Sequence, residues 1–242
     1  IEEVYSHKLT NIKPYIMVYG IYNAGKSSII NELLGSDEAK VNDKPETAVV
    51  QEFEWNGYTL ADTPGVGAPM DHEKITDENL KKADIVLFVM STTGSTEKKD
   101  NYDRLKEIVS LGKKVIVILN DKNGDLYTND SELQIIERKV KDNLQAVGLQ
   151  RDDFVITIVN AKRANKGRIE NKEKLVEKSN IQELKNILLS ELKLTDDYII
   201  INNAIVEILN DIETLKSYLS NDSNNLELDA LNNLLDNIRM IK

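Results

Sequence analysis

The sequence predicts an α/β protein with a doubly wound, mostly parallel sheet and one antiparallel edge strand. Apolar runs typical of buried strands alternate with segments of helical periodicity over residues 15–194. Polar, glycine-containing motifs follow the ends of these runs, where parallel sheets bind their ligands. An Asn-Gly pair between two strand-like runs predicts a hairpin, which supplies the antiparallel strand.

A glycine-rich turn joins the first predicted strand, residues 15–19, to the first predicted helix, which ends at Gly35. The turn reads GIYNAGKS over residues 20–27, which is the spacing of a phosphate-binding loop. Such a loop points backbone N–H groups at a phosphate, and the helix N-terminus adds positive potential. Lys26 can reach the β- and γ-phosphates, and Ser27 can ligate magnesium. The alternative is an ordinary strand–helix turn, which Lys-Ser at this offset disfavours. The residues expected at the nucleotide are Gly20, Asn23, Ala24, Gly25, Lys26, Ser27 and Ser28.

The other elements follow in chain order. Residues 36–47 predict a loop, and residues 49–55 and 58–61 predict the hairpin strands around Asn56-Gly57. A short helix precedes a buried strand over residues 84–90. Thereafter we expect a helix from a Thr96 cap to Gly112, a strand over 114–119, a helix from a Ser131 cap to Gly148 and a strand over 154–159. Residues 163–179 are charged and predict an exposed loop before a closing helix over 181–194.

The chain from residue 195 to residue 242 has a different pattern. Apolar residues recur at steps of four and three from Ile201 to Leu219, which is typical of a packed helical seam. A polar break over residues 220–225 separates this helix from a second amphipathic one. We therefore expect a nucleotide-binding domain over residues 1–194 and a C-terminal helical hairpin over 195–242. The hairpin either packs on its own domain or forms part of a stalk or a dimer contact.

Composition excludes several kinds of site. The net charge of -10 argues against general binding of nucleic acid or anionic lipid, although it allows a local basic patch. The chain has no cysteine and only two histidines, which excludes disulfides, thiolate chemistry and a histidine-rich metal site. It has no apolar run of about 18 residues and no signal peptide, so a membrane is not indicated and we expect a cytoplasmic protein.

Two further motifs have the residue types of a magnesium site. Asp62-Thr63-Pro64-Gly65 follows the second hairpin strand, where the Asp62 carboxylate can hold magnesium through water and the Gly65 N–H can touch a γ-phosphate. This motif alone is also a common turn. Thr47, the only threonine between residues 11 and 58, can complete the magnesium shell. The expected metal ligands are Ser27, Thr47 and Asp62.

These motifs, with Asn160-Ala161-Lys162 after the last strand, resemble those of the translation-factor-related P-loop GTPases. The Era-like and bacterial dynamin-like branches are the most similar, and the resemblance covers about residues 14–194. It implies a P-loop GTPase fold that binds GTP or GDP with magnesium and hydrolyses GTP. By the same resemblance Ala161 and Lys162 contact the purine. The residues implied in catalysis are Lys26, Thr47, Gly65 and Asn23.

The resemblance also bears on turnover. Val66 stands where Ras-like relatives place a glutamine that orients the attacking water, so slow basal turnover is expected. Asn23 matches an asparagine that helps several related GTPases to bind potassium beside the phosphates. The alternative role for Asn23 is a hydrogen bond within the loop.

The base-specificity motif departs from the family pattern, which is Asn or Thr, Lys, any residue, Asp. The chain reads NDKNGD over residues 120–125. In direct register Asn120 stands at the first position, Asp121 at the Lys position and Asn123 at the Asp position. Guanine offers two N–H donors that a carboxylate accepts together, so Asp125 could substitute if the loop carries an extra residue.

The sequence therefore favours a GTPase that switches or self-assembles on nucleotide binding, with a homodimer through its nucleotide face or its C-terminal helices. A nucleotide-sensing scaffold without turnover is a second hypothesis. A P-loop ATPase is a third, because the base motif is irregular.

Overall fold

The computed structural model describes residues 13–40, 50–63, 79–124, 130–150, 154–195, 197–220 and 232. Six strands form one sheet in the order β2-β3-β1-β4-β5-β6. All neighbouring strands run parallel except β2 and β3, which form an antiparallel hairpin at one edge. This confirms the predicted fold class. The strands are β1 (Tyr15–Tyr19), β2 (Gln51–Trp55), β3 (Tyr58–Asp62), β4 (Ile85–Ser91), β5 (Lys114–Asn120) and β6 (Val155–Val159).

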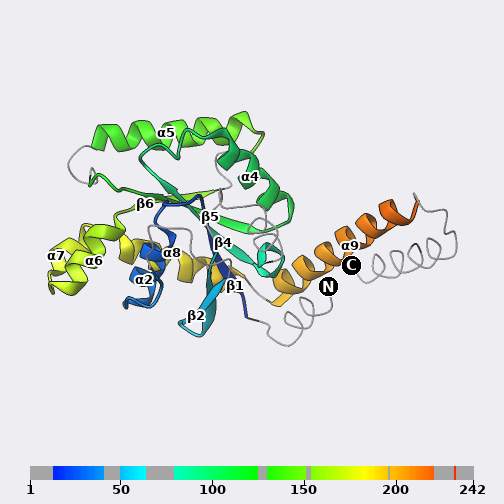
Figure 1. Cartoon of the computed structure of the whole chain (residues 1–242), viewed down its shortest axis with the longest axis horizontal. Coiled ribbons are helices and arrows are strands. Elements are labelled where there is room, and N and C mark those ends of the chain that lie inside the picture. Colours follow the sequence, from blue (N-terminus) through cyan, green and yellow to red (C-terminus); the bar gives the residue numbers. More distant parts are fainter. Residues whose placement is uncertain are drawn as a thin grey trace. The chain divides into compact units, whose positions relative to one another are not determined.

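Helices cover both faces of the sheet (Figure 1). Helices α2 (Lys26–Leu34) and α8 (Ile181–Leu194) pack on one face, together with the start of α6 (Ala161–Ile169). Helices α4 (Lys99–Ser110) and α5 (Asp130–Ala146) pack on the other. A hydrophobic core lies on each face of the sheet, and successive strand residues point alternately into one and the other. In β1, Ile16 and Val18 face α2, and Met17 faces α4.

Two predicted helix starts are wrong. Helix α4 has Lys98 at its N-cap without a side-chain bond, so Thr96 does not cap it. Thr96 is buried instead, and its carbonyl oxygen accepts a 2.5 Å hydrogen bond from the Tyr102 hydroxyl. Helix α5 begins at Asp130, which places Ser131 inside its first turn.

The expected loop over residues 163–179 is also wrong, because the segment is largely helical. It contains most of α6 and the whole of α7 (Glu173–Glu177). Asn160 caps α6, since its side chain accepts a hydrogen bond from the Arg163 N–H. Helix α7 then packs closely on α6 at Gly167, where an added Cβ would lie 2.8 Å from Val176 Cγ2. This close approach is what a glycine permits, and it makes α6 and α7 one compact helical pair.

The chain divides into two compact units. The larger is Lys13–Thr195, and the described part of the smaller is almost entirely α9 (Asp197–Ser220). Helix α9 carries the predicted seam, whereas the predicted second helix lies outside the described residues, so the hairpin stays a prediction. In the described part of the chain, no helix is long and apolar enough to cross a bilayer.

Candidate nucleotide site

The loop after β1 has a backbone that only its glycines allow. Gly25 has a φ of 102°, and a Cβ added there would lie 2.1 Å from Asn120 Nδ2. A Cβ at Gly20 would lie 2.3 Å from the Val89 carbonyl oxygen, so β4 passes too close for a side chain. Between them the Ala24 N–H bonds to the Ile21 carbonyl at 3.1 Å and closes a tight turn. The loop is therefore held in a fixed curve at the carboxyl end of β1.

Lys26 lies inside this curve. Its Nζ donates to the carbonyl oxygens of Gly20 at 3.1 Å and Ile21 at 3.4 Å. Burial lowers the pKa of Lys26 to about 8, against the opposing effect of the Asp62 carboxylate. No side chain caps α2, so the N–H groups of its first turn, from Lys26 to Ser28, face outward from the helix end. The loop thus combines a buried ammonium with open N–H donors, as an anion site requires.

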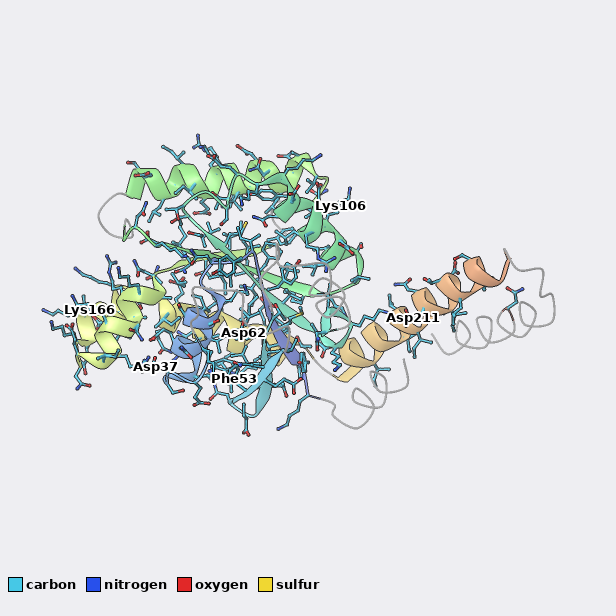
Figure 2. All side chains as sticks on the ribbon, viewed as in Figure 1. Asp37, Phe53, Asp62, Lys106, Lys166 and Asp211 are labelled. Atoms are coloured by element: carbon cyan, nitrogen blue, oxygen red, sulfur yellow. The ribbon has the colours of Figure 1, made fainter. Side chains whose placement is uncertain are left out.

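Ser27 and Asp62 meet beside this anion site. Ser27 Oγ donates to Asp62 Oδ2 at 2.7 Å, and Figure 2 shows Asp62 next to the start of α2. Asp62 Oδ1 is buried without a hydrogen bond, alone among the buried side-chain nitrogen and oxygen atoms of the described residues. Burial also raises the pKa of Asp62. An oxygen left in this state fits a cation ligand, and a hydroxyl beside a carboxylate is the donor set that magnesium prefers.

The described part of the site offers two oxygen ligands, Ser27 Oγ and the Asp62 carboxylate. Magnesium is usually held by one or two carboxylates together with water and substrate phosphate. Within the described ranges, no three His, Cys, Asp or Glu side chains gather as a metal cage. Thr47, the third predicted ligand, lies outside the described residues, as does Gly65.

Asn120 connects the phosphate loop to the far side of the site. It is buried at the end of β5, and its Nδ2 donates to the Ala24 carbonyl oxygen at 3.0 Å. Its Oδ1 accepts a long 3.4 Å hydrogen bond from the Ala161 N–H. Asn120 therefore links the phosphate loop to the start of α6. The Ala161 N–H, expected to face the purine, points to Asn120 here.

Asp121 lies inside the loop that follows β5. The residue is fully buried, and its carboxylate accepts hydrogen bonds from the Gly124 N–H at 2.9 Å and Asn160 Nδ2 at 3.2 Å. Arg163 braces the same loop, because its Nη2 donates to the Gly124 carbonyl at 3.2 Å. Asp121 thus organises the loop from within, while Asn123 is exposed on it.

Lys122 reaches the phosphate loop from the loop that follows β5. Its Nζ donates to the carbonyl oxygen of Asn23 and, at 2.9 Å, to Asn23 Oδ1. Its Cε lies 4.0 Å from the position of a Cβ at Gly25, so the stem crosses the phosphate loop. Lys122 stands one position after Asp121, the residue that direct register places at the Lys position. Sequence reasoning missed Lys122, and the signal that could have found it was a lysine two positions after Asn120.

The structure brings most predicted residues to one edge of the sheet. Asp62 and Asn120 are the last residues of β3 and β5, and the phosphate loop and Ala161 follow β1 and β6. Lys162 follows Ala161 in the first turn of α6, where its side chain is exposed. This edge of the sheet therefore presents the Lys26 ammonium, the free N–H groups at the start of α2, the Ser27–Asp62 pair and the loop after β5.

Comparison with known proteins agrees with this geometry. Residues 15–121 match the family described as 50S ribosome-binding GTPase. The tRNA modification GTPase MnmE of Petrotoga mobilis is 30% identical over 220 residues, which cover 85% of this chain and 44% of that protein. GTPase Era of Alkaliphilus oremlandii is 30% identical over 117 residues, covering 44% of this chain and 39% of Era.

A solved structure shares the fold. The LeoA bacterial dynamin GTPase from ETEC superposes with a TM-score of 0.60 at 20% identity, covering 86% of this chain and 41% of LeoA. The chain spans less than half the length of each of these three proteins. The matched residues and the fold agree: over residues 15–121 the chain is similar to the P-loop GTPases, with MnmE and Era among its relatives.

Proposed function

We propose that this protein binds guanine nucleotide with magnesium and hydrolyses GTP. The observation that carries the proposal is the Ser27–Asp62 pair, whose buried Oδ1 has no partner, beside the uncapped start of α2. An ionised carboxylate with one buried oxygen left without a hydrogen bond lowers stability, and a bound cation offsets that cost. The relatives are GTPases by name, which supports the same reaction class.

The chain's own residues hold the triphosphate in this proposal. Lys26 moves its ammonium from the carbonyls of Gly20 and Ile21 to the β- and γ-phosphates, and the first-turn N–H groups bind phosphate oxygens. Ser27 and Asp62 would hold magnesium, with Thr47 as the expected further ligand. Bound there, the ion would neutralise charge that develops on the bridging oxygen. By resemblance, the Gly65 N–H contacts the γ-phosphate.

Guanine specificity rests on the shifted register. Lys122 lies one residue beyond the direct-register lysine position, whereas Asp125 lies two residues beyond Asn123. We assign the carboxylate acceptor to Asp125, which lies outside the described residues and requires one further residue in the loop. Two N–H donors of guanine suit one carboxylate, whereas adenine offers no such pair. Asn123→Ala is the matched control, because direct register would give Asn123 this task.

Slow basal turnover is part of the proposal, since Val66 has no group to orient water. Asn23 Oδ1 accepts from Lys122, which supports the loop hydrogen bond over a potassium ligand. A rise in turnover with protein concentration would support self-assembly, and a rise with potassium over sodium would support the ion site.

Titration of GDP and ADP in magnesium tests the assignment. We expect a preference for GDP that Asp125→Ala removes and Asn123→Ala retains. Ser27→Ala should lower the magnesium dependence of GTP binding, whereas Ser36→Ala, which removes only a hydrogen bond to Glu38, should not. Equal affinities for GDP and ADP would overturn the guanine assignment in favour of an ATPase. GTP binding without phosphate release would favour the scaffold.

A further inference from the structure

Arg163, in the first turn of α6, joins the loop after β5 (residues 121–125, the base loop) to the end of α7. Its backbone N–H donates to Asn160 Oδ1 at 2.7 Å, so the cap of α6 fixes where the side chain starts. Its Nη2 donates to the Gly124 carbonyl oxygen at 3.2 Å, and its Nη1 donates to the Lys178 carbonyl oxygen at 3.0 Å. One guanidinium therefore bridges two segments that are far apart in the sequence.

Gly124 is held at both of its polar backbone atoms. Its N–H donates to Asp121 Oδ1 at 2.9 Å, and its carbonyl oxygen accepts from Arg163. The residue has a left-handed backbone with a φ of 86°, and a Cβ added there would lie 3.7 Å from Arg163 Nη2 and 3.8 Å from Asn160 Nδ2. The guanidinium therefore packs beside this turn as well as donating to it.

The Gly124 carbonyl belongs to the peptide unit that leads into Asp125. A peptide unit is planar, so the direction of its carbonyl sets the plane in which the next Cα lies. A donor fixed on this carbonyl therefore limits how the chain enters Asp125, the residue to which we assign the N–H donors of guanine. Asp125 itself lies outside the described residues.

The other end of the bridge is anchored on regular structure. Lys178 is the C-cap of α7, and the last carbonyls of a helix lack partners within the helix. The next two residues hold this end beside β6, because the Asn160 N–H donates to the Ser179 carbonyl at 2.9 Å and Asn180 Nδ2 donates to the Ile158 carbonyl at 3.2 Å. Helix α7 also packs on α6 (Figure 1). Arg163 therefore connects the base loop to a braced support.

We propose that Arg163 is a positioning residue for guanine recognition, which holds the Gly124 peptide so that the Asp125 carboxylate faces the base. The inference rests on the proposed assignment of guanine binding to Asp125. Without the donor on Gly124, the loop must be ordered at the moment of binding, and the carboxylate loses its fixed direction. Discrimination between guanine and adenine then falls.

A purely structural role for Arg163 would have different consequences. Support of the α6–α7 pair alone would affect stability and would change the affinities for all nucleotides in the same proportion. A guide for the base loop acts on the base and leaves phosphate binding unchanged, because the phosphates are assigned to the start of α2. Lysine replaces such an arginine only in part, since its ammonium lacks the planar fork that meets two carbonyls at once.

Calorimetric titration of GDP, ADP and pyrophosphate in magnesium tests this role, with pyrophosphate as the probe that has no base. Arg163→Met should reduce the preference for GDP over ADP by about tenfold, the effect of one charge-assisted hydrogen bond, and leave the pyrophosphate affinity unchanged. Arg163→Lys should restore part of the preference. In an Asp125→Ala background, Arg163→Met should cause no further loss of preference, because the carboxylate that it positions is gone.

The matched control is Arg168→Met. Arg168 lies on the same helix but pairs with Glu32 and Asp37, so its replacement weakens the support of α6 without removing a donor from Gly124. It should keep the GDP preference. An equal loss of preference in Arg168→Met, or a loss of pyrophosphate binding in Arg163→Met, would reduce the effect to a weakened α6 and overturn the proposal.

Circular dichroism establishes that each variant is folded. If Arg163→Met does not fold, Arg163→Lys decides, since lysine must still lose part of the preference. An additive loss in the double variant with Asp125→Ala would overturn the route through the carboxylate. Equal affinities of the wild type for GDP and ADP would overturn the guanine assignment and this role together. A wild-type preference that Asp125→Ala removes and Arg163→Met retains would overturn only the role of Arg163.

Discussion

Replacing Gly25 with alanine tests the packing on which the nucleotide site depends. The added Cβ would lie 2.1 Å from Asn120 Nδ2, and the residue has a φ of 102°. Asn120 is buried and donates to the Ala24 carbonyl, so it cannot retreat and keep that hydrogen bond. A left-handed backbone costs a residue with a Cβ about 1–2 kcal/mol. A buried polar group without its partner costs about 1–3 kcal/mol. We therefore expect Gly25→Ala to lower the free energy of unfolding by about 2–5 kcal/mol.

Gly35→Ala is the matched control. Gly35 also has a positive φ, 78°, but no atom lies within 4 Å of an added Cβ. Only the backbone cost applies there, about 1–2 kcal/mol. The difference between the two variants isolates the contact with Asn120. Asn120→Ala should reduce the further loss caused by Gly25→Ala, because it removes the atom that the methyl group meets.

Urea unfolding of the nucleotide-free protein, followed by circular dichroism, measures these losses. GDP titration should show that Gly25→Ala loses binding and that Gly35→Ala keeps it. Equal destabilisation by the two alanines would refute the reasoning. Additive losses in the Gly25→Ala, Asn120→Ala double variant would refute it as well.

Three further predictions follow from buried or capped groups. Burial lowers the pKa of Lys26 from 10.5 to about 8, so between these pH values the unfolded chain binds more protons. The free energy of unfolding of the wild type should therefore rise with pH through that window, by up to about 3 kcal/mol relative to Lys26→Met. Urea unfolding at each pH measures it. Parallel plots of unfolding free energy against pH for the two proteins would contradict this. Arg168→Met should lower the free energy of unfolding by about 3 kcal/mol, because it leaves the buried Glu32 carboxylate without its ion-pair partner. Lys172→Met breaks an exposed ion pair and should lower it by less than about 0.5 kcal/mol. Equal losses in urea unfolding would contradict this difference. Asn160→Ala removes the N-cap of α6 and a hydrogen-bond partner of Asp121. It should lower the free energy of unfolding by about 2 kcal/mol and weaken GDP binding. Unchanged GDP affinity would show that Asn160 does not support the base-binding loop.

Strands and strand ends were predictable because their signals are local. All five residues of β1 are buried, as a continuous apolar run in a central parallel strand requires. Asn56 and Gly57 both have positive φ, 50° and 80°, which is the turn that Asn-Gly favours. The polar motifs were then located by topology alone, since parallel strands deliver their carboxyl ends to one edge.

Helix α6 was not predictable in this way. Four of its nine residues are charged, and only Ala161, Ala164 and Gly167 are buried. Small residues give a weak periodic signal, although they allow the close packing of α7. A glycine that sequence rules treat as unfavourable in a helix is here the point of contact.

The base loop shows how contacts between distant residues decide a register. Asp121 turns inward because Asn160, 39 residues away, and the Gly124 N–H supply donors for its carboxylate. The Asp121 N–H also continues the pairing with β6 through the Val159 carbonyl, so the chain is still extended at this point. Side chains alternate along extended backbone, and the residue after a buried aspartate therefore points the other way.

That residue is Lys122, and its direction takes it across the phosphate loop to Asn23. A lysine one position after the direct-register place thus still reaches the phosphate loop. Asn120 on one side and Lys122 on the other fix Ala24 and Asn23 before any nucleotide arrives. A loop that is already ordered loses less conformational entropy on binding, so an irregular motif can still support a well-formed nucleotide site.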